Sequence, residues 1–253
     1  MKILSIGNSF SQDAQKWLHQ LAISAGCELF CANLFIGGCS LERHSRNYES
    51  GEAAYDYEIN GEFVQKISLP EALVKEKWDV ITFQQVSGLS GIFASFEPYF
   101  SKLAAAVREK CPEARILLHK TWAYENGSAH PDFANYGCSQ KKMFEEISKA
   151  YNEAAEKTGF EIIPTGDAIQ YLRENVKEFN PDGGILLTRD SFHLSFDYGR
   201  FTAGLVWLKA LTGINAKDVS FIPRVDGAAA DSAVLDVIKA ALDTMPQIRQ
   251  LYI

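Results

Sequence analysis

The fold is set by the stretch KILSIGNSFS at residues 2–11. Residues 2–6 form a short, mostly apolar run that stops at Gly7, as a buried parallel strand does. The segment at 12–25 then places its apolar side chains on one helical face. A strand, a glycine turn and a helix in this order predict the first βα unit of an α/β fold.

The same alternation of strands and helices continues along the chain. Further strands are predicted at 28–36, 79–83, 115–119 and 160–164, and helices at 69–77, 93–110, 139–158, 167–176, 196–212 and 232–251. Asn60-Gly61, between alternating runs at 55–59 and 63–67, predicts a small β-hairpin excursion at the edge of the domain. Strands separated by helices of this length imply a parallel sheet covered on both faces. With no linker or repeat in the sequence, we expect one domain over residues 1–253.

The composition narrows the class of protein. The chain has 32 acidic and 25 basic residues and a net charge of −7, which argues against a nucleic-acid or anionic-membrane surface. Its five cysteines form no CxxC pair, so free thiols in a reducing compartment are favoured over a zinc site. The sequence has no run of about 18 apolar residues and no signal peptide, so we expect a cytoplasmic protein.

The candidate catalytic residues follow the strands, where functional groups of an open parallel sheet collect. Ser9 follows the first strand, in a place where serine is also a common helix N-cap. As a nucleophile it needs a base within reach. His193 is the candidate base, and Asp190, three residues earlier, is the candidate group that orients its ring. A DxxH also occurs in surface turns and metal sites, but the only further ligand nearby is Asp197, so we expect no metal.

An oxyanion hole requires preorganised hydrogen-bond donors. The backbone N–H groups of Ser9 and Gly38 are candidates, since a glycine lets the backbone approach a substrate closely. Gln84 or Gln85 is a candidate side-chain donor. Neighbouring residues of a strand point to opposite sides, so only one of the two faces the site, and we favour Gln85.

Three further residues are candidates for substrate binding. His44 and Asn47 follow Gly38 in a predicted loop beside the pocket, where polar side chains also simply face water. Trp122 lies beyond the fourth strand, where its ring either stacks on a sugar or packs in the core.

Together these residues resemble the SGNH (GDSL-like) hydrolase superfamily, and more narrowly its DUF4886 group. The segments that carry the resemblance are GNSFS (7–11), IGGCSLERH (36–44), FQQVSG (83–88), KTWAY (120–124) and RDSFHLSFDYGRF (189–201). The resemblance implies a flavodoxin-like three-layer α/β/α fold with a five-stranded parallel sheet. It also implies hydrolysis of esters, often acetyl esters on carbohydrates. Two departures are GNS in place of GDS, and FQQVS in place of the GxND block that supplies an asparagine donor.

The leading hypothesis is a serine esterase that needs no cofactor and acts on a small-molecule or glycan ester. A transacylase fits the same residues, because an alcohol can replace water as the acceptor. A non-catalytic carbohydrate-binding protein is favoured only by the missing asparagine. A nucleotide- or flavin-binding module would leave DxxH unexplained, and the chain lacks GxGxxG and Walker spacing.

Overall fold

The computed structural model describes residues 1–249 and contains one large mixed sheet. Five strands of this sheet are parallel, in the order β2-β1-β5-β6-β7. Their bounds are β1 (Lys2–Gly7), β2 (Phe30–Phe35), β5 (Val80–Phe83), β6 (Arg115–His119) and β7 (Glu161–Ile163). The chain therefore winds outward in both directions from β1, which is the doubly wound, flavodoxin-like arrangement.

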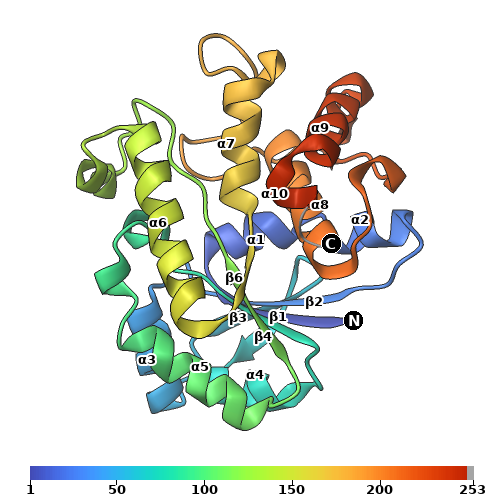
Figure 1. Ribbon diagram of the computed structural model, residues 1–253. Coiled ribbons are helices and arrows are strands. Elements are labelled where there is room, and N and C mark those ends of the chain that lie inside the picture. The colour runs from blue at the N-terminus through green and yellow to red at the C-terminus, as the bar shows by residue number, and fades with distance from the viewer. Residues whose placement is uncertain (250–253) are drawn as a thin grey trace.

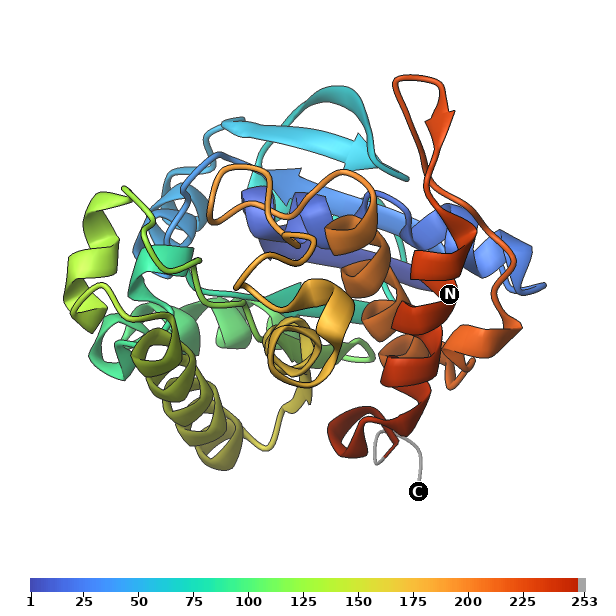
Figure 2. The same ribbon diagram turned by 90° about the horizontal axis from the view of Figure 1, so that it is seen from above.

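The predicted hairpin is present and extends this sheet. β3 (Tyr55–Ile59) pairs antiparallel with β2, and β4 (Glu62–Ile67) pairs with β3 to give a seven-stranded sheet. Asn60 and Gly61 adopt φ of 52° and 84°, the left-handed values that a tight hairpin turn requires. The hairpin is visible in cyan along one edge of the molecule in Figure 2.

Helices cover both faces of the sheet, as Figure 1 shows with α1 and α8 on one side and α4 and α5 on the other. The mixed α/β, three-layer fold predicted from the sequence is thus confirmed. The α-helices are α1 (Ser9–Gln15), α2 (Leu18–Ser24), α3 (Leu41–Ser50), α4 (Leu69–Lys75), α5 (Tyr99–Lys110), α6 (Gln140–Thr158), α7 (Thr165–Asn175), α8 (Tyr198–Thr212), α9 (Ser232–Thr244) and α10 (Pro246–Arg249).

Three predicted helices differ in extent from those observed. The segment at 12–25 is two short helices, α1 and α2, which both pack against α8. The segment at 93–110 is interrupted before α5 by Pro98, which disfavours a helical residue ahead of it. The segment at 232–251 divides into α9 and α10, and its last two residues lie outside the described residues.

One helix was not predicted at all. The sequence predicts a loop after β2, but residues 41–50 form α3. Its boundaries carry ordinary signals: the Ser40 side chain accepts a hydrogen bond from the backbone N–H of Arg43, and Gly51 ends the helix at φ 67°. This helix changes the direction in which the side chains near Gly38 point.

No helix among residues 1–249 has both the length and the apolar character that crossing a membrane requires.

Candidate active site

Ser9 stands at the turn between β1 and α1, and its hydroxyl is not used as a helix cap. Asn8 caps α1 instead, with its side chain accepting a hydrogen bond of 3.0 Å from the backbone N–H of Phe10. The N–H of Asn8 in turn donates to Ser11 Oγ at 3.1 Å. The turn begins at Gly7, where a Cβ atom would lie 2.2 Å from Ser11 Oγ. The local structure thus leaves the Ser9 hydroxyl available to other groups.

Asp190 and His193 belong to a closed turn that follows α7. The backbone N–H of Arg189 donates to the His193 carbonyl at 2.9 Å. Inside the turn, Asp190 Oδ1 accepts from the backbone N–H of His193 at 2.7 Å. Asp190 is therefore held by the residue whose ring it contacts.

The structure brings Ser9, His193 and Asp190 into one hydrogen-bonded chain. His193 Nε2 lies 2.9 Å from Ser9 Oγ, and His193 Nδ1 lies 2.7 Å from Asp190 Oδ2. Partial burial raises the pKa of Asp190, but hydrogen bonds from the His193 side chain and backbone outweigh it and leave that pKa below its usual value. An ionised Asp190 favours the tautomer that carries its proton on Nδ1, which leaves Nε2 free to accept the Ser9 proton.

Aromatic side chains pack around His193 and the turn that carries it. The Phe10 ring stacks on Trp122 with centroids 4.1 Å apart, and the Phe192 ring lies 4.2 Å from the His193 ring. The Trp122 indole donates to the Phe192 carbonyl at 2.7 Å. Trp122 is fully buried, so of the two predicted alternatives its ring packs in the core and does not stack on substrate. Its ring supports the turn that carries His193.

Gly38 lies in a tight turn next to Ser9. The backbone N–H of Cys39 donates to the Ile36 carbonyl at 3.1 Å, and Gly38 itself is exposed with φ +64°. The Asn8 side chain donates to the Cys39 carbonyl at 3.0 Å and so ties this turn to the residue before Ser9. Within the described part of the chain, the backbone N–H groups of Ser9 and Gly38 have no hydrogen-bond acceptor.

The two glutamines are engaged elsewhere. Gln85 Nε2 donates to the carbonyl and hydroxyl of Ser95, and its Oε1 accepts from the backbone N–H of Leu41 and Val86. The expectation that Gln85 donates to an oxyanion is therefore wrong, because its amide holds two loops together.

Gln84 lies on the other side of the strand end, next to the nucleophile turn. Its Nε2 donates to Asn8 Oδ1 at 2.6 Å, and its Oε1 lies 2.5 Å from Nδ1 of the buried His119. No hydrogen bond joins Gln84 to Ser9, so its observed contacts position Asn8. A donor role toward an oxyanion stays a prediction.

His44 and Asn47 do not border the site, because α3 turns both side chains inward. His44 is fully buried, with Nδ1 2.9 Å from the Tyr55 hydroxyl, and burial lowers its pKa to about 3. Asn47 is 8% exposed and faces the same interior. The expectation that they bind substrate is wrong for His44 and has no support for Asn47.

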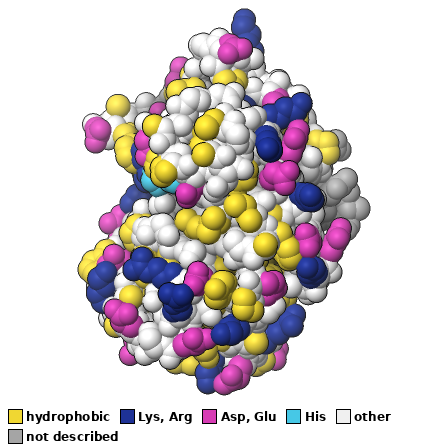
Figure 3. Space-filling model, turned by 90° about the vertical axis from the view of Figure 1, so that its left-hand side faces the viewer, with side chains coloured by type: hydrophobic (Ala, Val, Ile, Leu, Met, Phe, Trp, Pro, Cys, Tyr) yellow, Lys and Arg dark blue, Asp and Glu magenta, His cyan; other side chains and the backbone are white. Residues whose placement is uncertain are grey.

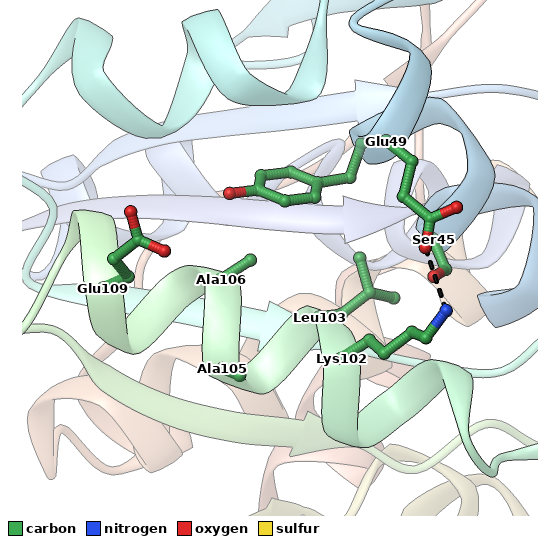
Figure 4. A pocket seen from close by; sticks show the side chains of 8 residues that line it. Ser45, Glu49, Lys102, Leu103, Ala105, Ala106 and Glu109 are labelled. Carbon is green, nitrogen blue, oxygen red and sulfur yellow. Dashed lines mark hydrogen bonds and ion pairs between the residues drawn. The ribbon is translucent and has the colours of Figure 1, made fainter.

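The site opens at the end of the molecule where the parallel strands terminate. In Figure 1, β1 runs from the N-terminus at the right toward the left, so Figure 3 faces this end, and a histidine is visible there beside acidic and hydrophobic side chains. The side chains of His193 and Asp190 are 20% and 41% exposed. A separate groove of about 340 Å³ lies between α3 and α5, and Figure 4 shows the Lys102–Glu49 ion pair of 2.9 Å that joins the two helices there. Neither Ser9 nor His193 lines that groove.

No group of three metal-binding side chains occurs among residues 1–249.

The comparisons with known proteins agree with the fold. A family model described as a domain of unknown function (DUF4886) matches residues 2–241. A crystal structure of a DUF4886 family protein from Bacteroides uniformis is 38% identical, with a TM-score of 0.86 over 96% of this chain and 93% of that one. No curated protein matches the chain.

More distant solved structures share the fold. A candidate SGNH hydrolase from Slackia heliotrinireducens is 22% identical, with a TM-score of 0.58 over 83% of this chain and 97% of that one. A variant of an acetyl-xylooligosaccharide esterase from Geobacillus is 14% identical, with a TM-score of 0.50 over 87% and 94% of the two chains.

Proposed function

We propose that this chain, which belongs to the DUF4886 family, is a serine esterase of the SGNH type. The observation that carries the proposal is the hydrogen-bonded chain from Ser9 through His193 to Asp190, with separations of 2.9 and 2.7 Å. A nucleophile, a base and a group that orients the base are the parts that acyl transfer through a serine requires.

In the acylation step, Ser9 Oγ attacks the ester carbonyl carbon while His193 Nε2 takes the hydroxyl proton. Asp190 stabilises the imidazolium that forms, without taking its proton. The backbone N–H groups of Ser9 and Gly38, both without an internal acceptor, hold the negative charge on the former carbonyl oxygen. The C–O bond to the alcohol then breaks, and His193 gives its proton to the departing alcohol.

In the second step, water replaces the alcohol. His193 takes a proton from water as its oxygen attacks the acyl carbon, and the Ser9–acyl bond breaks with return of the proton to Ser9. The carboxylic acid leaves, and the resting hydrogen bonds are restored.

The substrate class that we propose is an acetyl ester of a carbohydrate. The SGNH resemblance favours it, and a solved acetyl-xylooligosaccharide esterase has the same fold. The partly exposed Asp190 and His193 leave room for a bulky alcohol. Acetate release from acetylated xylo-oligosaccharides, compared with turnover of p-nitrophenyl acetate and octanoate, tests this class. Faster turnover of the octanoate would contradict it.

The reaction type is tested by p-nitrophenyl acetate turnover and fluorophosphonate labelling of the wild type, Ser9→Ala and His193→Ala. Losing either residue should lower kcat by roughly a thousandfold or more, and Ser9→Ala should abolish labelling. Ser24→Ala and His19→Ala are matched controls, because they remove the same residue types outside the site and should keep full activity. Equal activity in all five proteins would sink the esterase proposal.

A further inference from the structure

Asp13 is a buried carboxylate on the same helix as Ser9. It lies four residues after Ser9 in α1, one helical turn along the same face, and its side chain is fully buried. A buried carboxylate is costly unless cations and hydrogen bonds surround it. The partners of Asp13 show which segments of the fold this carboxylate connects.

Two of those partners, Arg189 and Leu194, lie on the segment that carries Asp190 and His193. Asp13 Oδ2 accepts from the backbone N–H of Leu194, directly after His193, at 2.9 Å. Arg189, directly before Asp190, donates to Asp13 Oδ1 at 3.0 Å and also to the Leu194 carbonyl. Both backbone polar groups of Leu194 are therefore held by this pair.

A second arginine completes the cluster from α8. Arg200 Nε donates to Asp13 Oδ1 at 2.8 Å, and its side chain is 12% exposed. The guanidinium groups of Arg200 and Arg189 lie 4.6 and 4.7 Å from the Phe196 ring, close enough for cation–π attraction. The Asp13 carboxylate thus joins α1, the turn at 189–194 and α8. Figure 2 shows the orange segment after α7 crossing over α1.

We propose that Asp13 is a positioning residue that sets the separation between Ser9 and His193. This inference rests on the proposed esterase function. It concerns how Ser9 and His193, 184 residues apart in sequence, are brought within hydrogen-bond distance. Ser9 moves with α1, whereas His193 moves with the turn. Asp13 binds the backbone one residue past His193, so a shift of the turn relative to α1 would have to break this contact.

The consequence for catalysis is a change in rate rather than in binding. A misplacement of about 1 Å between reacting groups costs about a hundredfold in rate. Asp13→Asn keeps the size of the side chain but removes the charge that both arginines contact, and it turns one acceptor into a donor facing them. We expect kcat to fall by about 10- to 100-fold with KM unchanged, because Asp13 does not touch substrate.

The test compares wild type, Asp13→Asn and a matched control, Asp167→Asn. Asp167 is a mostly buried carboxylate paired with Lys120 at 2.6 Å, and it has no hydrogen bond to the 189–194 turn. Two readouts are measured below the melting temperature: kcat and KM for p-nitrophenyl acetate, and hydrogen exchange of the peptide spanning 189–194 by mass spectrometry. We expect lower kcat and faster exchange in Asp13→Asn alone.

Exchange separates this proposal from the esterase proposal. Should the wild type show no esterase activity, faster exchange in Asp13→Asn alone still supports the positioning role. If exchange of the 189–194 peptide in Asp13→Asn is no faster than in the wild type, the positioning role is overturned, whether or not kcat falls. If Asp13→Asn does not fold, Arg200→Lys takes its place, since it keeps the charge and loses the Nε contact. Wild-type kcat and exchange in that variant would overturn the proposal.

Discussion

At the scale of single residues, the contacts of Asn8 account for an amide in place of the aspartate of the GDS pattern that the sequence resembles. Its Oδ1 accepts from the backbone N–H of Phe10 and from the Gln84 amide, while its Nδ2 donates to the Cys39 carbonyl. A carboxylate has no donor for that last bond. An amide therefore suits this position, because its N–H group donates to the Cys39 carbonyl and holds the turn that contains Gly38.

Asn8→Asp should consequently lower both the stability of the fold and the rate of ester turnover. The new carboxylate would place an oxygen about 3 Å from the Cys39 carbonyl oxygen in a site that is 1% exposed. We expect about 1–3 kcal/mol of lost stability and a lower kcat for p-nitrophenyl acetate, measured with urea unfolding and steady-state kinetics. Asn152→Asp, an exposed change, is the control. An Asn8→Asp variant as stable and active as this control would contradict the role given to Asn8.

The sequence predicted which side chains meet at the site better than it predicted their surroundings. Ser9, Asp190 and His193 lie at a strand end and in a compact DxxH turn, so their meeting depends on topology alone. Where Gln85 and His44 point depends on α3, which was expected to be a loop. Asp13 was missed, although an acidic residue one turn after Ser9 is a visible signal.

At the scale of elements, the β1–α1 turn is the most constrained junction of the site. Ser11, whose Oγ would meet a Cβ at Gly7, is itself held by Asn33 Oδ1 at 2.7 Å and by the Asn8 carbonyl at 2.9 Å. A methyl group at Gly7 therefore has to displace the first turn of α1, which carries Ser9.

Gly7→Ala should cost roughly 3 kcal/mol of stability through overpacking and most of the esterase activity. Gly159→Ala is the comparison, because Gly159 ends α6 at φ +72° with open space around it, so only about 1 kcal/mol of backbone strain is expected. Urea unfolding with parallel ester assays measures both. If Gly7→Ala and Gly159→Ala lose the same stability, or if Gly7→Ala remains active, the β1–α1 turn tolerates a shift and the prediction is wrong.

The elements themselves were largely predictable because apolar periodicity is a local signal. All five parallel strands and the hairpin follow from runs of a few residues, and Gly7 and Asn60-Gly61 mark their ends. Helix breaks were harder to predict, since α1 and α2 each pack on α8, nearly two hundred residues away in sequence. That packing is tertiary, and no short window of the sequence contains it.

At the scale of the whole molecule, two buried histidines make stability depend on pH. Burial lowers the pKa of both His44 and His119 to about 3, whereas in the unfolded chain each titrates near 6.5. Between these values the unfolded chain binds more protons. The stability that the neutral rings contribute is present above about pH 6.5 and is lost as pH falls toward 3.

We expect the free energy of unfolding to decrease by up to about 1.4 kcal/mol per pH unit for each of the two histidines below pH 6. His119→Gln keeps an N–H that can face Gln84 and should remove about half of this slope. Asn152→Gln, an exposed change that removes no titratable group, should leave the slope unchanged. Guanidinium unfolding at pH 5.0, 5.5 and 7.0 provides the measurement. A slope unaffected by His119→Gln would exclude His119 as its source.

The distance along the chain between the parts of the site has a consequence for biosynthesis. Ser9 and Asp13 leave the ribosome first, but their partners His193 and Arg200 follow 184 and 187 residues later. Until then the nascent chain carries an isolated serine and an unpaired carboxylate. The hydrogen-bonded chain of Ser9, His193 and Asp190 can therefore form only after the turn at 189–194 has been synthesised and has packed against α1.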